Sequence, residues 1–389
     1  MPLNVSRTLA MSSRNLKPAT NKLDRGGQQR LARAGGHISR RPSVRSASVA
    51  LLLAGVLTTI AAVAADASQF VVDSAGRRVE IPDHIARVQP AGPPATVLIY
   101  ALAPEKLIGW VRKPREAELA YLSPVVRNLP EVGRLTGRGD TANVEAVMAA
   151  KPEVIIDFGS VTPTYVSLAD RVQSQTGIPY LLIDGHFANT AAALRLVGKI
   201  LGVEDRAERL ARRSEEILSE VDRVVASVPV ERHPNVYLAR QPGGLESGNR
   251  GSINTEIIER AGGTNVVEGG REGGGLVTAS MEQVIAWNPD TIVTTDEKFF
   301  QAVPSAVPWQ QTEAVRQHRV FLSPTLPYGW IDAPPSLNRL IGLQWLARLF
   351  LPDQFAQNLR TATKDFYKQF YQVDLSEPDL DRLLAGAQN

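Results

Sequence analysis

The stretches NVEAVMAAKPEVIID (residues 143–157) and SMEQVIAWNPDTIVT (residues 280–294) repeat one pattern at a spacing of 137 positions. Each stretch begins with a polar residue that can cap a helix, continues through a glutamate and a short helical pattern, and reaches a proline before an aliphatic run. Pro152 and Pro289 end the two helices, and the aliphatic runs behind them suit buried strands. The repeat predicts two halves built on one design of loop, short helix and strand.

The repeat extends towards the N-terminus of both stretches. Aligned without gaps, residues 133–156 and 270–293 share glycines, prolines and both glutamates, and the pairs include Gly133 with Gly270 and Arg134 with Arg271. Glycines and prolines coincide because the backbone needs the same turns in both copies.

The chain from Phe70 onward alternates short aliphatic runs with helical patterns, which predicts parallel α/β architecture. The candidate strands are residues 86–89, 107–110, 154–158, 180–184, 236–239, 291–295 and 320–322. A turn-rich loop follows each of them. Because ligands gather at the carboxyl ends of strands in open parallel sheets, we expect the binding site among these loops.

Residues 203–228 form a long charged segment between the two halves. Its apolar positions have helical spacing: Ala207, Leu210, Ile217, Val221 and Val224. A helix of about 22 residues here is roughly 33 Å long. The segment predicts a stiff strut between two α/β halves, and the alternative is an ordinary surface helix within one domain.

The composition favours a soluble globular protein of two domains, with 389 residues, 43% hydrophobic and 21% charged. The formal net charge of +3 comes from residues 1–67, which contain ten Lys/Arg but only Asp24 and Asp66 as acids. The rest of the chain holds 33 basic and 38 acidic residues, a balance of −5. This distribution argues against a nucleic-acid partner.

The leader has the form of a cleaved secretory signal. Basic residues up to Arg45 precede a short apolar run that ends in small residues, with cleavage after Ala64 or Ala67. The run is short for a membrane span, while the true start and the export route (Sec or Tat) stay open. The sequence has no cysteine, so we expect a periplasmic protein without lipid anchor, disulfide or thiolate-held metal.

The opening segment (residues 85–110), the repeated glutamate-led helix and the long central helix together resemble periplasmic binding proteins for iron–siderophore, haem and vitamin B12 uptake. The resemblance covers residues 70–373 and implies the helical-backbone (class III) type. Its fold is α/β, with two Rossmann-like lobes containing parallel central sheets, bridged by one rigid α-helix. The implied parts are the leader (1–67), the N-terminal lobe (68–188), the connecting helical segment (189–227) and the C-terminal lobe (228–389).

The resemblance also implies a role for the repeated glutamates. In the family, such residues at the lobe tips meet arginines of a permease built from two like subunits, which points to Glu145 and Glu282. Two matched carboxylates suit a two-fold symmetric partner. The alternative is that each glutamate only stabilises the first turn of its helix.

The loops expected to face the cleft supply aromatic, basic and amide side chains. Aromatic walls suit flat chelators or macrocycles, and arginines pair with anionic complexes. Arg240 and Arg250 can also be solvated loop charges, and Tyr328 and Trp330 can be core residues. Arg134 also lies in these loops, where a structural role is at least as plausible as ligand contact. The predicted ligand-binding residues are Pro94, Arg138, Phe158, His186, Phe187, Tyr237, Arg240, Arg250, Asn254, Phe299, Tyr328 and Trp330.

The sequence predicts a binding protein rather than an enzyme. It has no nucleophile elbow or convincing nucleotide loop, and the histidines of its body lack ligand spacing for a bare metal ion. We expect a monomer without resident cofactor that captures an iron–siderophore or similar metal chelate and delivers it to an ABC transporter permease with its ATPase. The alternatives are a corrinoid, haem or nickel chelate as cargo, a ligand sensor, or an exported bilobed transferase.

Overall fold

The computed structural model describes residues 67–136, 144–268, 275–352, 354, 355 and 357–387. The predicted signal peptide, Arg138 and Arg271 therefore lie outside the described residues. The chain divides into two units, residues 1–63 and 64–389, and all that follows concerns the second. None of the helices described within it combines the length and apolar character needed to cross a membrane.

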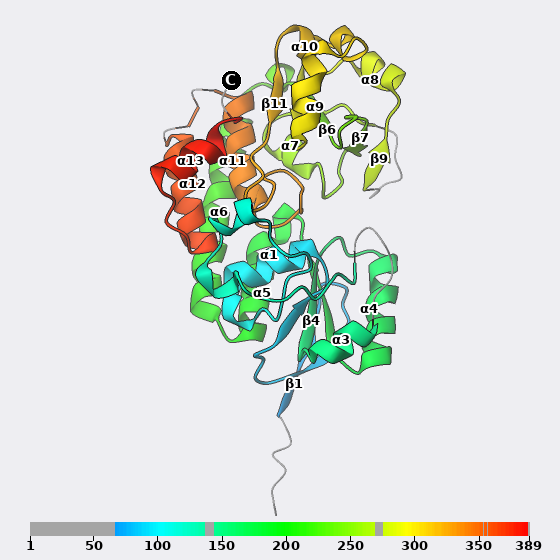
Figure 1. Ribbon diagram of the computed structural model, residues 1–389, viewed down its shortest axis with the longest axis vertical. Coiled ribbons are helices and arrows are strands. Elements are labelled where there is room, and N and C mark those ends of the chain that lie inside the picture. Colours follow the sequence, from blue (N-terminus) through cyan, green and yellow to red (C-terminus); the bar gives the residue numbers. More distant parts are fainter. Residues whose placement is uncertain (1–66, 137–143, 269–274, 353, 356, 388–389) are drawn as a thin grey trace, which may run out of the picture. The chain divides into compact units, whose positions relative to one another are not determined.

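The N-terminal lobe is built on a parallel sheet in the order β3-β4-β5. Alternate residues of its strands point to opposite faces. Ile156 and Leu181 join a core cluster with α1 and α5, while Ile155 and Leu182 join a separate cluster with α4. Helices on both faces explain why these strands are apolar nearly throughout (Figure 1). The elements of this lobe are the antiparallel hairpin β1 (Ser68–Val72) and β2 (Arg78–Pro82), then β3 (Val88–Pro90), α1 (Pro93–Leu102), α2 (Glu116–Leu119), α3 (Val144–Ala150), β4 (Val154–Gly159), α4 (Pro163–Thr176), β5 (Tyr180–Asp184) and α5 (Thr190–Leu201).

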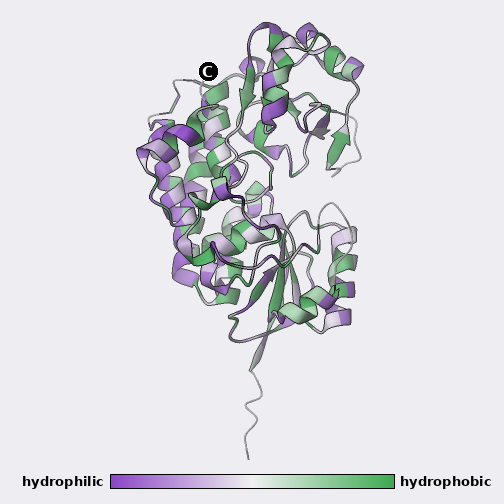
Figure 2. Ribbon diagram, viewed as in Figure 1, coloured by the Kyte–Doolittle hydropathy of each residue, from purple (hydrophilic) through white to green (hydrophobic). Residues whose placement is uncertain are grey.

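The C-terminal lobe repeats this design with a parallel sheet in the order β11-β10-β6-β8. Figure 2 shows that the strands of both sheets are largely hydrophobic, whereas the helices carry mixed faces. The elements of this lobe are β6 (Asn235–Ala239), β7 (Glu246–Gly248), α7 (Glu256–Arg260), β8 (Thr264–Asn265), β9 (Leu276–Thr278), α8 (Met281–Trp287), β10 (Thr291–Thr294), α9 (Glu297–Ala302), α10 (Glu313–Arg316) and β11 (Val320–Leu322). The chain ends with α11 (Arg339–Phe350), α12 (Leu359–Phe366), a π-helical turn (Tyr367–Tyr371) and α13 (Glu377–Leu384).

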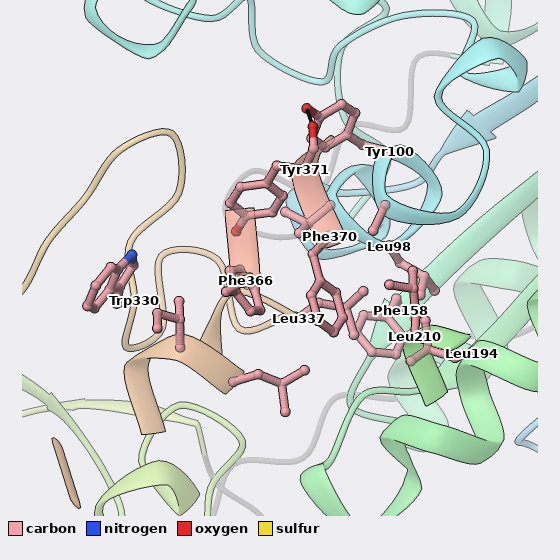
Figure 3. Close-up of a cluster of buried hydrophobic side chains, with 14 of the residues drawn as sticks. Leu98, Tyr100, Phe158, Leu194, Leu210, Trp330, Leu337, Phe366, Phe370 and Tyr371 are labelled. Carbon is pink, nitrogen blue, oxygen red and sulfur yellow. Dashed lines mark hydrogen bonds between the residues drawn. The ribbon is translucent and has the colours of Figure 1, made fainter. Parts of the chain in front are cut away.

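The long helix α6 (Glu204–Ala226) connects the two lobes and confirms the predicted strut. All five of its predicted apolar positions are buried. Its side chains belong to one hydrophobic cluster that also contains residues of α11, of the N-terminal sheet and of β6. Figure 3 shows Phe158, Leu194 and Leu210 close together, and the C-terminal aromatic residues Phe366 and Phe370 belong to the same cluster. A continuous core therefore runs from one sheet to the other.

The strand predictions needed two corrections. Residues 107–110 form no strand, because Leu107 and Trp110 make only isolated bridges, to Val88 and Glu131. The strand predicted at residues 86–89 begins at Val88 instead, since the amides of residues 86 and 87 donate to the carboxylate of Glu153. The other five predicted strands are present within a residue of their predicted ends.

A buried ion pair of the C-terminal lobe bonds to the N-terminal lobe beside this core. Arg339, at the start of α11, is 1% exposed, and its Nη1 donates to Glu256 Oε1 of α7 at 2.6 Å. Its Nη2 donates to the carbonyl oxygen of Gly185, the residue that follows β5, at 2.6 Å. The Glu256 carboxylate also accepts from the amide of Phe187 at 3.2 Å, and the Arg339 guanidinium lies 4.4 Å from the Phe187 ring centroid. We name Arg339, Glu256, Gly185 and Phe187 the interlobe hub.

We expect Arg339→Met to lower the free energy of unfolding by about 3 kcal/mol, because it leaves the Glu256 carboxylate without its partner in a poorly solvated place. Denaturant titration measures the change. The double variant Arg339→Met/Glu256→Gln should recover part of the loss, since no unpaired charge then remains. A loss below about 1 kcal/mol in the single variant would contradict a stabilising role of the Arg339 guanidinium.

Candidate ligand-binding cleft

Two adjoining cavities lie between the lobes and share Pro93, Arg134 and Pro334 in their walls. Both are lined by residues of the N-terminal and the C-terminal lobe, so they form one cleft with two chambers. The first, the arginine chamber, has a volume of about 770 Å³, and its charged lining residues are Arg112, Arg115, Glu118, Arg134, Asp296, Glu297 and Lys298. The second, the aspartate chamber, has a volume of about 890 Å³, and its charged lining residues are Arg134, Asp157, Arg240, Glu246 and Asp332.

The cleft lies where the sheet topology predicts a ligand site. Phe158 and Gly159 end β4, and Arg240 follows β6, so strand ends of both sheets reach the aspartate chamber. Thr295 and Asp296, which follow β10 in the sequence, line the arginine chamber. Carboxyl ends of parallel strands thus meet at the cleft from both sides.

Five of the twelve predicted ligand-binding residues line this cleft. Pro94, Phe158, Arg240 and Asn254 line the aspartate chamber, and Tyr328 lines the arginine chamber. Phe158 is only 2% exposed and belongs to the core cluster as well. Whether they contact a ligand stays a prediction. Arg138 lies outside the described residues.

Three predicted aromatic contacts are instead core residues. Tyr237 and Trp330 are 0% exposed and Phe299 is 2% exposed. The Tyr237 hydroxyl donates to the carbonyl oxygen of Gly244 at 3.0 Å, and Trp330 Nε1 donates to the hydroxyl of Tyr367 at 3.3 Å. The Phe299 ring packs edge-on against Trp309, with 4.9 Å between centroids. Apolar packing and satisfied polar atoms leave these rings no surface towards the cleft.

Three further predicted residues do not line either chamber. His186 Nδ1 lies 2.6 Å from Asp184 Oδ1, and this hydrogen bond raises the pKa of the imidazole. Phe187 lies in the interlobe hub. Arg250 donates to the carbonyl oxygen of Asn265 and pairs with Glu268 at 2.7 Å, so it stabilises the packing of its loop against residues 265–268.

Arg240 faces the aspartate chamber with its charge already compensated. Its Nη1 lies 2.7 Å from Glu246 Oε1, and its Nε lies 3.1 Å from Asp332 Oδ2. The Asp332 side chain is fully buried, and this burial raises its pKa while the Arg240 charge lowers it. An anionic ligand would have to compete with two carboxylates for this guanidinium.

Arg134 has the opposite character. It is exposed, borders both chambers, and forms no ion pair with another residue of the described part of the chain. Lys298, on the opposite lobe, is likewise exposed and unpaired among the described residues. The sequence placed Arg134 in a loop expected to face the cleft, and its recurrence in the repeat left a structural role at least as plausible as ligand contact.

Asp157, at the end of β4, is a buried carboxyl group in the wall of the aspartate chamber. Burial raises its pKa to about 6. The hydroxyl of Tyr180 at 3.2 Å and that of Thr136 at 3.4 Å donate to its two oxygens and partly offset this effect. Across the described ranges, no three acidic or histidine side chains are grouped so that they could hold a metal ion.

Comparison with known proteins defines the class to which this fold and cleft belong. The sequence profile of the periplasmic binding protein family matches residues 109–325, more than half of the chain, and the chain belongs to this family. The family comprises solute-binding proteins of ABC transporters rather than enzymes and works outside the cytoplasm, so family membership implies a permease and an ATPase as partners.

The matches to individual relatives cover nearly the full length of those relatives. The molybdate-binding protein MolA of Haemophilus influenzae is 26% identical over an alignment 360 residues long, which covers 85% of this chain and 97% of MolA. The structure of an ABC transporter solute-binding protein from Sulfurospirillum deleyianum is 29% identical, with a TM-score of 0.75, and the match covers 81% of this chain and 99% of the other. A protein of an Fe³⁺-hydroxamate transport system from Saccharomonospora viridis, 17% identical with a TM-score of 0.56 and 73% and 99% coverage, shares the fold.

We expect Asp157 to make stability depend on pH between about 4 and 6. Its folded pKa is about 6 and its ordinary value is 3.8, so in this window the folded state keeps a proton that the unfolded state has lost. The stability of the wild type relative to Asp157→Asn should therefore fall by roughly 3 kcal/mol as the pH rises through this window, and stay constant above it. Parallel stability curves for the two proteins, from denaturant titrations at each pH, would contradict the raised pKa.

Proposed function

We propose that this protein captures an anionic metal chelate, with a ferric siderophore as first candidate, in the cleft between its lobes. The observation that carries the proposal is Arg134, an exposed cation without an ion-pair partner in the described chain, placed where the two chambers meet. A guanidinium in such a place suits carboxylate, catecholate or other anionic oxygens of a ligand. Each chamber has the volume of a small-molecule site, well above that of a bare ion.

A metal oxyanion is the second candidate cargo. One relative that matches over nearly its whole length is named as a molybdate-binding protein, and molybdate also needs cationic donors. Haem and corrinoids are less well supported, because Tyr237, Phe299 and Trp330 are core residues and leave the cleft fewer aromatic surfaces for a flat macrocycle. A nickel chelate stays open as a variant of the first candidate.

We further propose that Glu145 and Glu282 dock the loaded protein onto the permease. Both are exposed, and they occupy equivalent positions in the first turns of α3 and α8, one on each lobe. Each of these helices leads into a strand of a different sheet, β4 after α3 and β10 after α8, so the pair suits a two-fold symmetric partner. No described residue forms an ion pair with either carboxylate, although hydrogen bonds with its own backbone and with Ser280 lower the pKa of Glu282. An arginine of a partner can therefore pair with each.

Isothermal titration with three defined probes tests the cargo. The probes are a trianionic ferric tris-catecholate, a neutral ferric tris-hydroxamate and sodium molybdate. We expect the wild type to bind the anionic chelate more tightly than the neutral one, and Arg134→Ala to weaken that binding about 10- to 100-fold, as expected for a charge-assisted hydrogen bond.

Arg232→Ala, which removes an exposed arginine remote from the cleft, is the control and should bind like the wild type. Binding of molybdate alone would select the second candidate. Binding of none of the three probes, or equal affinities of wild type and Arg134→Ala, would contradict the proposal.

The docking role predicts that Glu145→Arg/Glu282→Arg lowers ligand uptake at least 10-fold while ligand affinity stays unchanged, because reversed charges repel the permease arginines. Uptake is measured in proteoliposomes containing the cognate permease and ATPase. Glu231→Arg, at another exposed glutamate, is the control and should transport normally. Undiminished transport by the double variant would leave these glutamates with a role in their helices only.

A further inference from the structure

The segment between Trp110 and α2 contains a group of charged residues that the proposed function does not use. Glu118, in α2, has a side chain only 3% exposed, and both Arg112 and Arg115 bond to it. Arg112 Nη2 lies 2.9 Å from Glu118 Oε1 and 3.0 Å from Oε2, while Arg115 Nη2 lies 2.7 Å from Oε1. All three residues line the arginine chamber.

We infer that Arg112 and Arg115, held by Glu118, form an anion clamp that takes the anionic oxygens of the cargo. The inference rests on the proposed function and adds the place and the chemical class of the group recognised: a carboxylate, catecholate or oxyanion. The aspartate chamber then receives the remainder of the ligand.

The charges of the clamp favour this role. Two guanidiniums share one carboxylate, so the group keeps an excess of one positive charge. The buried Glu118 carboxylate bonds to both arginines, while the side chains of Arg112 and Arg115 remain 58% and 67% exposed. Guanidinium groups fixed in this way lose less conformational freedom when an anion binds, and their planar donors match paired oxygens.

The other charged residues of the arginine chamber keep its net charge positive. Arg134 lies in its wall, and Lys298 approaches from the opposite lobe, so four cationic and three acidic side chains line it. Tyr328 also lines the chamber, and its buried hydroxyl has no hydrogen-bond partner in the described chain.

The aspartate chamber has the reverse balance. Three carboxyl groups line it together with two arginines, and one of these, Arg240, is paired with two of the acids. Electrostatics therefore directs the anionic end of a ligand to the arginine chamber.

A purely structural role for the trio makes different predictions. In that case Glu118 and the arginines only fasten the turn before α2, whose first amide, that of Arg115, donates to Glu118 Oε2 at 2.7 Å. Substitutions would then change stability but not affinity. Two variants separate the roles: Arg112→Lys/Arg115→Lys keeps both charges without the planar donors, and Glu118→Gln makes the chamber more positive but releases the arginines.

The test is isothermal titration of the full mature protein with the trianionic ferric tris-catecholate and with sodium molybdate, alongside thermal unfolding. For the probe that the wild type binds, the clamp predicts at least 10-fold weaker binding by the lysine variant. It also predicts severalfold weaker binding by Glu118→Gln, although general electrostatic attraction predicts tighter binding there. Arg209→Lys/Arg212→Lys, an arginine pair of α6 outside the cleft, is the matched control and should bind normally.

Unchanged affinity in the lysine variant, or equal or tighter binding by Glu118→Gln, overturns the clamp while the proposed function stands on the wild-type and Arg134→Ala results. Wild-type protein that binds neither probe overturns the proposed function and the clamp together.

Discussion

The buried guanidinium of Arg339, which pairs with Glu256 and bonds to both lobes, is the constraint on which the cleft depends. A guanidinium that is 1% exposed is tolerated only where its donors are satisfied, and here they reach Glu256, Ile253 and Gly185. These acceptors come from both lobes, and the Phe187 ring covers the cation. The relative position of β5, α7 and α11 is thereby fixed at the base of the cleft. Since α6 and the shared core join the same lobes, the structure favours a cleft of nearly constant width that recognises its ligand by prearranged charges.

The distribution of paired and unpaired charges then determines what such a cleft can bind. Arg240 lies in the wall but is held by Glu246 and Asp332, whereas Arg134 has no such partner among the described residues. Arg112 and Arg115 fall between these extremes, since one buried glutamate holds both and leaves net positive charge. Counting arginines around a cleft is therefore a poor guide to its ligand, and the carboxylates behind each arginine decide its availability.

Much of the fold could be predicted from the sequence because it depends on local patterns. Helical spacing of apolar residues placed α6, and aliphatic runs placed β5 and β11 at their observed bounds. The repeat indicated two lobes of one design, which the two parallel sheets confirm. The prediction of a strand at residues 107–110 was wrong, because an aliphatic run does not reveal whether a partner strand pairs with it. The hairpin of β1 and β2 was missed because these strands are short and half exposed.

The candidate site was less predictable, since it depends on contacts between distant residues. Tyr237 follows the alternation of β6 into the core, and sequence alone does not tell which face of a doubly covered strand meets the cleft. Arg240 looked available because its partner Asp332 lies in a remote loop. The sequence analysis did not select Arg112 or Arg115, because the buried Glu118 that holds them is recognised only in the structure.

The most direct test of the account is anomalous diffraction from crystals grown with the bound ferric catecholate or molybdate, measured at the iron or molybdenum absorption edge. The account predicts one metal peak in the cleft beside Arg134, with the ligand's anionic oxygens towards Arg112 and Arg115. A peak outside the two chambers, or a ligand in the cleft that leaves Arg134 uncontacted, would contradict it.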